Sequence, residues 1–114
     1  MNSPPAWQCY AQDFLTDVQE WDDIAVGIYF RFLNYQWINR SIPPTIKGMS
    51  TLCNSDEETV GRCWNEYIKY KFKENPEGRY YNKRLDDYYQ QLMNHRKKCS
   101  RAGKKSAESR KNKD

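Results

Sequence analysis

Asn75-Pro76-Glu77-Gly78-Arg79-Tyr80-Tyr81-Asn82-Lys83-Arg84-Leu85-Asp86 is the stretch that decides the fold. Its first four residues are turn formers, and they separate two short alternating runs, 70–73 and 79–82. This pattern predicts two strands joined by a tight turn. Helical patterns lie on both sides of the strands, so the sequence predicts a mostly α chain with a small β-hairpin (α+β). With two helical patterns upstream, this order is typical of a winged-helix domain, here with an extra C-terminal helix and a basic tail.

The helix before the hairpin, expected at 56–70, has the clearest periodicity. Ser55 and Glu58 fit a capping box, with the serine as the N-cap and the glutamate three residues later. Apolar residues then follow at helical spacing, which predicts one buried face: Val60, Cys63, Trp64, Tyr67 and Ile68. The last helix is expected at about 83–98, with Leu85, Tyr88, Tyr89, Leu92 and Met93 facing inward.

Three further helical patterns lie upstream, at about 10–15, 22–39 and 45–53. Asp22 is the expected N-cap of the long one, because a short side chain can accept from the free N–H groups of a first turn. Its predicted apolar stripe is Val26, Phe30, Leu33 and Trp37, broadened by Ile24, Ile28 and Tyr35. Gly48 should weaken the short helix by about 1 kcal/mol relative to alanine.

Charge divides the chain of 114 residues into two parts. Residues 96–114 hold nine Lys/Arg and two Asp/Glu, a net charge of +7. Residues 1–95 hold ten Lys/Arg and thirteen Asp/Glu, a net charge of −3. The basic segment 96–114 has too few apolar residues to join a core, so we expect a disordered tail or a frayed helix. The sequence therefore predicts one winged-helix-like domain, residues 1–95, followed by a basic tail.

Nothing in the sequence indicates export or a membrane. The start of the chain lacks a basic region followed by an apolar one, and the longest near-apolar run, 24–30, is far below the roughly 20 residues of a membrane helix. A cytoplasmic protein in a bacterial host is expected. The cysteines should then be reduced, with Cys53 and Cys63 as small buried residues.

Several motifs together resemble the YdaU-like domain of phage and prophage proteins, over residues 7–110. The most specific is Tyr80-Tyr81-Asn82-Lys83-Arg84-Leu85-Asp86, and Ala102–Arg110 looks like the basic segment that commonly follows this domain. The other matching positions are Trp7, Tyr10, Asp13, Phe14, Leu15 and Asp17, then Gly27, Tyr29 and Leu33, then Ile42-Pro43. The resemblance implies a winged-helix-like fold and a place among phage DNA-replication genes. The function of this domain is unknown.

The sequence offers no catalytic constellation, and we expect neither an enzyme nor a cofactor. His95 is the only histidine, and with Cys99 it supplies only two potential ligands, too few for a zinc site. The carboxylate pairs 13/17, 22/23 and 86/87 are explained by capping and solvation. No glycine-rich phosphate loop is present.

Basic residues predict DNA as the partner, bound without sequence preference by the hairpin and the tail. Around the hairpin these are Lys71, Lys73, Arg79, Lys83 and Arg84; in the tail they are Arg96, Lys97, Lys98, Arg101, Lys104, Lys105, Arg110 and Lys111. The tail could also serve only as a linker. Tyrosines could stack on single strands, but core packing better explains most aromatic residues, since only one of Tyr80 and Tyr81 can face solvent.

The helix expected at 56–70 would normally enter the major groove. Here it opens with Asp56, Glu57 and Glu58, which phosphates would repel, although Arg62, Asn65 and Lys69 follow. The charged face Asp56, Glu57, Glu58 and Arg62 therefore suggests an alternative, an adaptor that recruits or inhibits a host or phage replication protein. A transcription regulator is a further alternative. The sequence does not indicate the oligomeric state.

Overall fold

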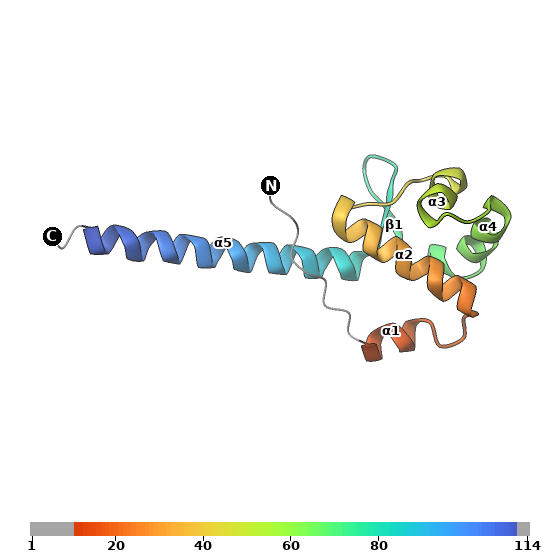
Figure 1. The fold of residues 1–114 in the computed structure, drawn as a ribbon, viewed down its shortest axis with the longest axis horizontal. Helices are drawn as coiled ribbons and strands as arrows, with labels where there is room; N and C mark the ends of the chain where they lie inside the picture. Colours follow the sequence, from red (N-terminus) through yellow and green to blue (C-terminus); the bar gives the residue numbers. More distant parts are fainter. Residues whose placement is uncertain (1–10, 112–114) are drawn as a thin grey trace.

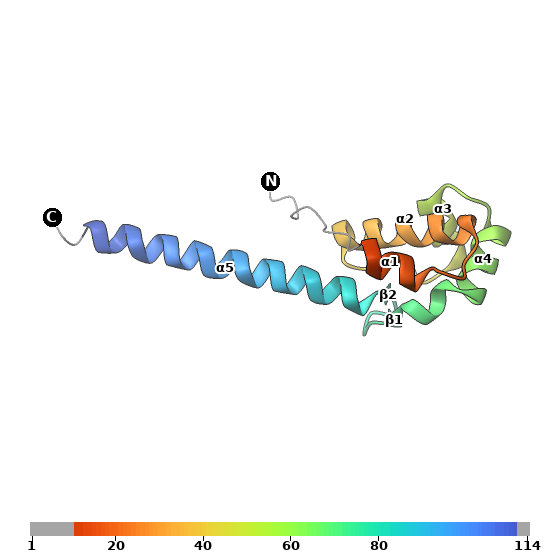
Figure 2. The same ribbon diagram turned by 90° about the horizontal axis from the view of Figure 1, so that it is seen from below.

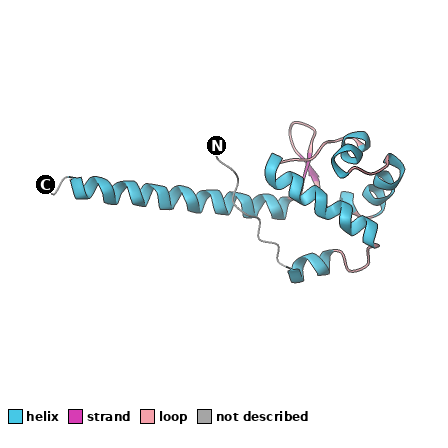
Figure 3. Cartoon of the chain, in the orientation of Figure 1, coloured by secondary structure: helices cyan, strands magenta, loops and turns pink. Residues whose placement is uncertain are grey.

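The computed structural model describes the backbone of residues 11–111 and the side chains of residues 11–99. This part of the chain is mostly helical, with one small antiparallel sheet, as the sequence predicted (Figures 1 and 3). The elements are α1 (Ala11–Asp17), α2 (Asp23–Asn39), α3 (Ile46–Cys53), α4 (Glu57–Glu66), the 3-10 helix η1 (Ile68–Lys71), β1 (Lys73–Glu74), β2 (Tyr80–Tyr81) and α5 (Lys83–Lys111). Trp7 and Cys9 lie outside the described residues.

Side-chain caps start the three central helices. Asp22 caps α2 as predicted, because its carboxylate accepts from the backbone N–H of Ala25 at 2.8 Å. Asp56 caps α4 through the N–H of Thr59, also at 2.8 Å. The predicted cap at Ser55 was wrong by one residue: its hydroxyl instead contacts the carbonyl of Cys53 at 3.4 Å. Asp56 takes the role because its backbone is extended where the helix begins.

The connection from α4 to the hairpin differs from the prediction. The first strand was expected at 70–73, but Tyr70 and Lys71 belong to η1, and β1 starts only at Lys73. The strands pair with Lys73 opposite Tyr81, and Ile42 forms an isolated antiparallel bridge with Tyr80. The segment between α2 and α3 thus runs along the outer side of the hairpin.

The hairpin turn is built by Asn75 and Gly78. The Asn75 side chain accepts from the backbone N–H groups of Glu77 and Arg79, at 3.0 and 2.9 Å. Gly78 has φ +80°, in the region that glycine tolerates best. The turn-forming residues in the sequence therefore act as predicted.

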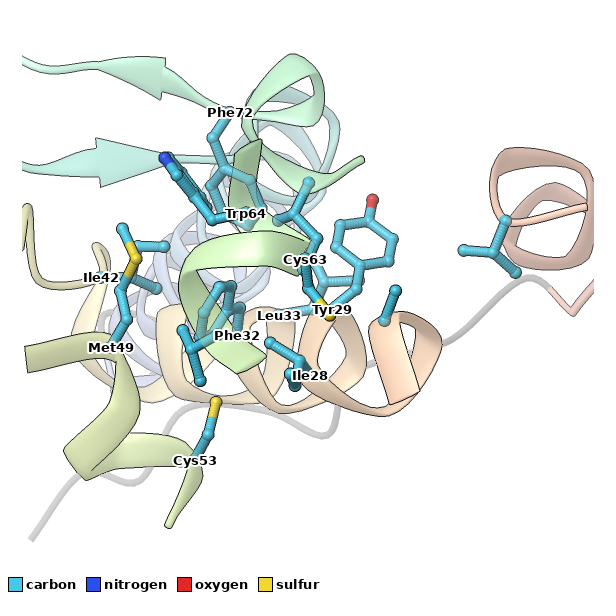
Figure 4. Close-up of a cluster of buried hydrophobic side chains, with 14 of the residues drawn as sticks. Ile28, Tyr29, Phe32, Leu33, Ile42, Met49, Cys53, Cys63, Trp64 and Phe72 are labelled. Carbon is cyan, nitrogen blue, oxygen red and sulfur yellow. The ribbon is translucent and has the colours of Figure 1, made fainter. Parts of the chain in front are cut away.

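The core lies between α2, α3, α4 and the hairpin (Figure 4). Trp64 is buried at its centre, with its ring 5.0 Å from Tyr80 and 5.6 Å from Phe72. Cys53 and Cys63 are buried as expected. The buried hydrophobic side chains of the described residues are Val18, Ala25, Ile28, Tyr29, Phe32, Leu33, Trp37, Ile42, Met49, Cys53, Val60, Cys63, Trp64, Ile68, Phe72 and Leu85.

The orientation predicted for α2 was partly wrong. Leu33 and Trp37 are buried, but Phe30 and Ile24 are 43% and 56% exposed. Ile28, which was also predicted, is buried as well, and α2 further turns Ala25, Tyr29, Phe32 and Gln36 inward. Apolar residues occur all around this helix, so their spacing alone could not fix its orientation.

Helix α5 packs against the body only near its start. Leu85 is buried, and Tyr88, Tyr89 and Leu92 pack against the core. Beyond them the helix leaves the other elements and extends alone (Figure 2). It continues past the expected end near Lys98 to Lys111, so most of the basic segment, expected to be disordered or a frayed helix, has helical backbone. A helix needs no core where it propagates from a turn that is already formed and contains mostly good helix formers.

Candidate nucleic-acid interface

The start of α5 is fixed in the body by Asn82. Its side-chain oxygen caps α5 by accepting from the N–H of Leu85 at 3.0 Å. Its amide nitrogen donates to the Tyr29 hydroxyl at 3.2 Å and to the Lys71 carbonyl at 3.0 Å. Burial, followed by the charge of Asp17, raises the pKa of Tyr29 to about 12, so this phenol stays neutral. Asn82 therefore holds α5 to both α2 and η1.

Two of the predicted DNA-binding residues, Lys71 and Arg84, share one carboxylate. The Arg84 guanidinium lies 2.9 Å from one oxygen of Asp17, and the Lys71 ammonium lies 3.6 Å from the other. Asp17 is the last residue of α1, so these ion pairs connect α1 with η1 and α5. A paired cation presents less positive potential to a phosphate, which weakens both residues as DNA contacts.

Arg40 is a structural cation that the sequence reasoning missed. It ends α2 in a left-handed conformation, with φ +74°. Its guanidinium forms an ion pair with Asp86 and stacks 3.4 Å from the centre of the Tyr89 ring. Asp86 and Tyr89 are one turn apart on α5, so Arg40 clamps that helix from the side. Its partners lie more than 40 residues away along the chain, and no local pattern indicates the contact.

The hairpin exposes less positive charge than predicted. Arg79 donates to the Ser41 hydroxyl at 2.7 Å and is only half-exposed. Lys73 is exposed, but Glu74 beside it and Glu77 in the turn are exposed as well. The hairpin therefore offers one accessible cation, Lys73, with two carboxylates nearby.

Further exposed cations lie on α5. Lys83 is exposed in its first turn, and Arg96, Lys97 and Lys98 are exposed where the helix has left the body. The remaining predicted tail residues lie on the last turns of the helix, where the structure describes only the backbone: Arg101, Lys104, Lys105, Arg110 and Lys111.

The acidic start of α4 is exposed and separate from these cations. Asp56 acts as a cap, and the bond from the Thr59 N–H lowers the pKa of its carboxyl. Glu57 and Glu58 in the first turn are exposed, and no ion pair joins them to another described side chain. Arg62 is not part of a free charged face, because it lies 3.1 Å from Asp22 and 3.6 Å from Glu66.

Metal and membrane features were sought in the described part of the chain. Nε2 of His95 contacts the Cys99 sulfur at 3.6 Å, and no three His, Cys, Asp or Glu side chains there are placed to hold a metal ion. Among the described helices none is both long and apolar enough to cross a bilayer. The thiols of Cys53, Cys63 and Cys99 are free.

Comparison with known proteins places the chain in no group. No protein-family model, no curated protein and no solved structure matches it.

Proposed function

We propose that this protein binds DNA without sequence preference through α5, as a non-enzymatic component of phage or prophage DNA replication or its control. The observation that carries the proposal is the separation of charge along α5. The helix is anchored in a body of net −3 and leads into a segment of net +7 that stands away from it. Distance from the acidic body, together with the exposure of Arg96, Lys97 and Lys98, suits this segment to contact phosphates, which dominate non-specific affinity.

The proposed fold type is a winged helix, with α2, α3 and α4 as its three helices and β1–β2 as its wing. The bridge between Ile42 and Tyr80 supports this, because it adds a third short strand segment to the hairpin. The replication context rests on the resemblance to the YdaU-like domain. The Asn82–Asp86 motif that carries this resemblance is the anchor of α5, so the motif can be explained by structure without any contact to DNA.

The test is a DNA-binding titration of the full chain at two salt concentrations, beside a variant with Arg96, Lys97 and Lys98 changed to glutamine. Glutamine keeps the helix and removes the charge. If all three contact phosphates, the slope of log affinity against log salt should fall by about 2.7 on duplex, from about 0.9 per contact. Lys47→Gln, at an exposed position on α3, is the control, and it should change the DNA affinity little.

A variant lacking residues 100–114 extends the test to the part of α5 whose side chains are not described. It should keep the parent's melting temperature, since the packed part of α5 ends near Leu92, and lose most of its affinity. Equal binding by the truncated chain would confine the DNA site to residues 1–99, and the Arg96, Lys97 and Lys98 variant would then distinguish α5 from the body. Absence of binding by the full chain at low salt would refute the DNA role.

The adaptor remains the second candidate, and the exposed, unpaired Glu57 and Glu58 favour it. A basic partner surface could dock on this first turn of α4. Changing both residues to glutamine should abolish capture of a replication protein from host lysate while leaving DNA binding unchanged. Capture that persists in this variant would refute this docking face.

A further inference from the structure

Tyr70 is the most conspicuous exposed side chain in the described part of the body. Its relative exposure is 73%, whereas most other aromatic side chains of residues 11–99 are buried or pack against the core. Tyr80, one of the two hairpin tyrosines considered for stacking, packs on Trp64 at 5.0 Å, in line with the core packing that the sequence favoured. Single exposed apolar side chains are common on protein surfaces, so this ring becomes a candidate contact only together with the charges beside it.

The geometry of η1 forces Tyr70 outward. Ile68 and Phe72, two residues before and after it, are 0% and 8% exposed and belong to the core. Ile68 on η1 and Phe72 just after it both turn inward, whereas the Tyr70 ring between them is left in solvent. A polar residue at this exposed position would be equally compatible with the fold.

One cation lies over the ring, and a second exposed lysine follows in the chain. The Lys69 ammonium lies 5.3 Å from the centre of the Tyr70 ring. Lys73 follows three residues after Tyr70, so its backbone is within about 10 Å along the chain. Within the described residues neither lysine forms an ion pair, in contrast to Lys71, which Asp17 binds. Segment 69–73 therefore presents an exposed aromatic ring, one lysine over that ring and a second exposed lysine three residues further on.

We propose that Tyr70 stacks on an unpaired base of single-stranded DNA while Lys69 and Lys73 contact the neighbouring phosphates. This deepens the proposed DNA-binding function and rests on it. Base stacking on aromatic side chains next to cations is how single strands are bound without sequence preference. A duplex hides the faces of its bases, so a ring at the end of one side chain can stack only on an unstacked strand. In chain order, segment 69–73 connects α4, the proposed recognition helix, with β1 of the proposed wing.

The test compares Tyr70→Leu, Tyr70→Phe and the parent on a fluorescent oligothymidylate strand and on a duplex of equal length. Leucine removes the π face, and phenylalanine keeps it. We expect Tyr70→Leu to weaken single-strand binding by roughly 5- to 150-fold and to leave duplex binding unchanged, whereas Tyr70→Phe should bind as the parent does. Ile38→Ala, 66% exposed on α2, is the surface control.

A double variant, Lys69→Gln with Lys73→Gln, completes the set and should reduce the salt dependence of single-strand binding. Because Tyr70 is exposed, its variants should melt with the parent. Parent-like single-strand binding by Tyr70→Leu would refute this proposal alone, as would an equal loss on the duplex. Failure of the full chain to bind either probe would refute both this proposal and the general DNA role.

Discussion

The side chain of Gln36 is hydrogen-bonded to both backbone groups of Asn82. Its amide nitrogen donates to the Asn82 carbonyl at 3.0 Å, and its oxygen accepts from the Asn82 N–H at 2.6 Å. Both residues are buried, and they lie 46 positions apart. The side chain thus satisfies the backbone as a neighbouring strand would, at the point where β2 passes into α5.

Replacement of Gln36 by leucine should strongly destabilise the protein. Leucine fills a similar volume but leaves a buried N–H and a buried carbonyl without partners, at about 1–3 kcal/mol each. The free energy of unfolding, measured by urea denaturation, should fall by about 2–5 kcal/mol. Gln91→Leu, at an exposed site on α5, should change it little. A parent-like Gln36→Leu variant would show that water satisfies these groups.

Alanine should have opposite effects at two helical glycines. At Gly27 an added Cβ meets no atom within 4 Å, so Gly27→Ala should stabilise the protein by about 0.5–1 kcal/mol through helix propensity. At Gly48 the same Cβ would lie 2.7 Å from Cβ of Pro43, in a rigid ring. Gly48→Ala should therefore destabilise, despite the same propensity gain. Thermal melts of the two variants measure both signs, and a stabilised Gly48→Ala would show that the Pro43 segment yields easily.

Acid should remove the contribution of the Asp22 cap. The bond from the Ala25 N–H, followed by that from Arg62, lowers the pKa of Asp22 below its usual 3.8. A pKa lowered by folding adds stability above the unfolded value, and this is lost as pH falls through the folded value. Asp22→Asn should thus be less stable than the parent at pH 7 and equal to it well below pH 3.8. Denaturation at both pH values checks this.

Asp22→Ser serves as the control for that comparison, because serine caps without charge. The difference in free energy of unfolding between Asp22→Ser and the parent should also shrink in acid. If the serine hydroxyl caps better than the asparagine amide, Asp22→Ser should be the more stable of the two variants. A stability gap for Asp22→Asn that stays constant with pH would show that the carboxylate does not act through its charge.

Neutralising Asp17 should increase DNA affinity if Lys71 and Arg84 reach phosphates. Asp17→Asn releases both cations from their shared carboxylate and should raise affinity severalfold at low salt, while stability drops by about 1 kcal/mol or less per pair. Asp13→Asn removes the same charge from an exposed site on α1 and is the matched control. Equal effects of the two variants in a titration would mean that only net charge matters, and that these two cations serve folding.

The local features of the fold were readable from the sequence because their causes are local. The face of α4 formed by Val60, Cys63 and Trp64 follows from spacing, and the hairpin turn follows from the conformational preferences of Asn75 and Gly78. The orientation of α2 was not readable, since its apolar residues are not confined to one face. Gln36 is a polar residue in the core, and its partner lies far away in the sequence. No residue close to it in the sequence therefore indicates that it is buried.

Only the residue types of the candidate site could be predicted from the sequence. The sequence shows which residues are cations, but whether a cation is free depends on contacts between distant segments. Asp17 engages Arg84 across 67 positions, and Ser41 engages Arg79 across 38. Tyr70 was missed for a related reason: the expected strand at 70–73 hid the outward position that η1 gives it.

Because α5 is held only at its base, it acts as a lever on the body. Lys98 lies about 22 Å along the helix axis from its first residue, at 1.5 Å per residue, so a force applied there exerts its torque on the contacts around Asn82 and Arg40. Any partner that pulls on or bends the outer helix therefore loads the buried pair between α2 and the hairpin. A load on the outer part of α5 is therefore transmitted to the core of the protein.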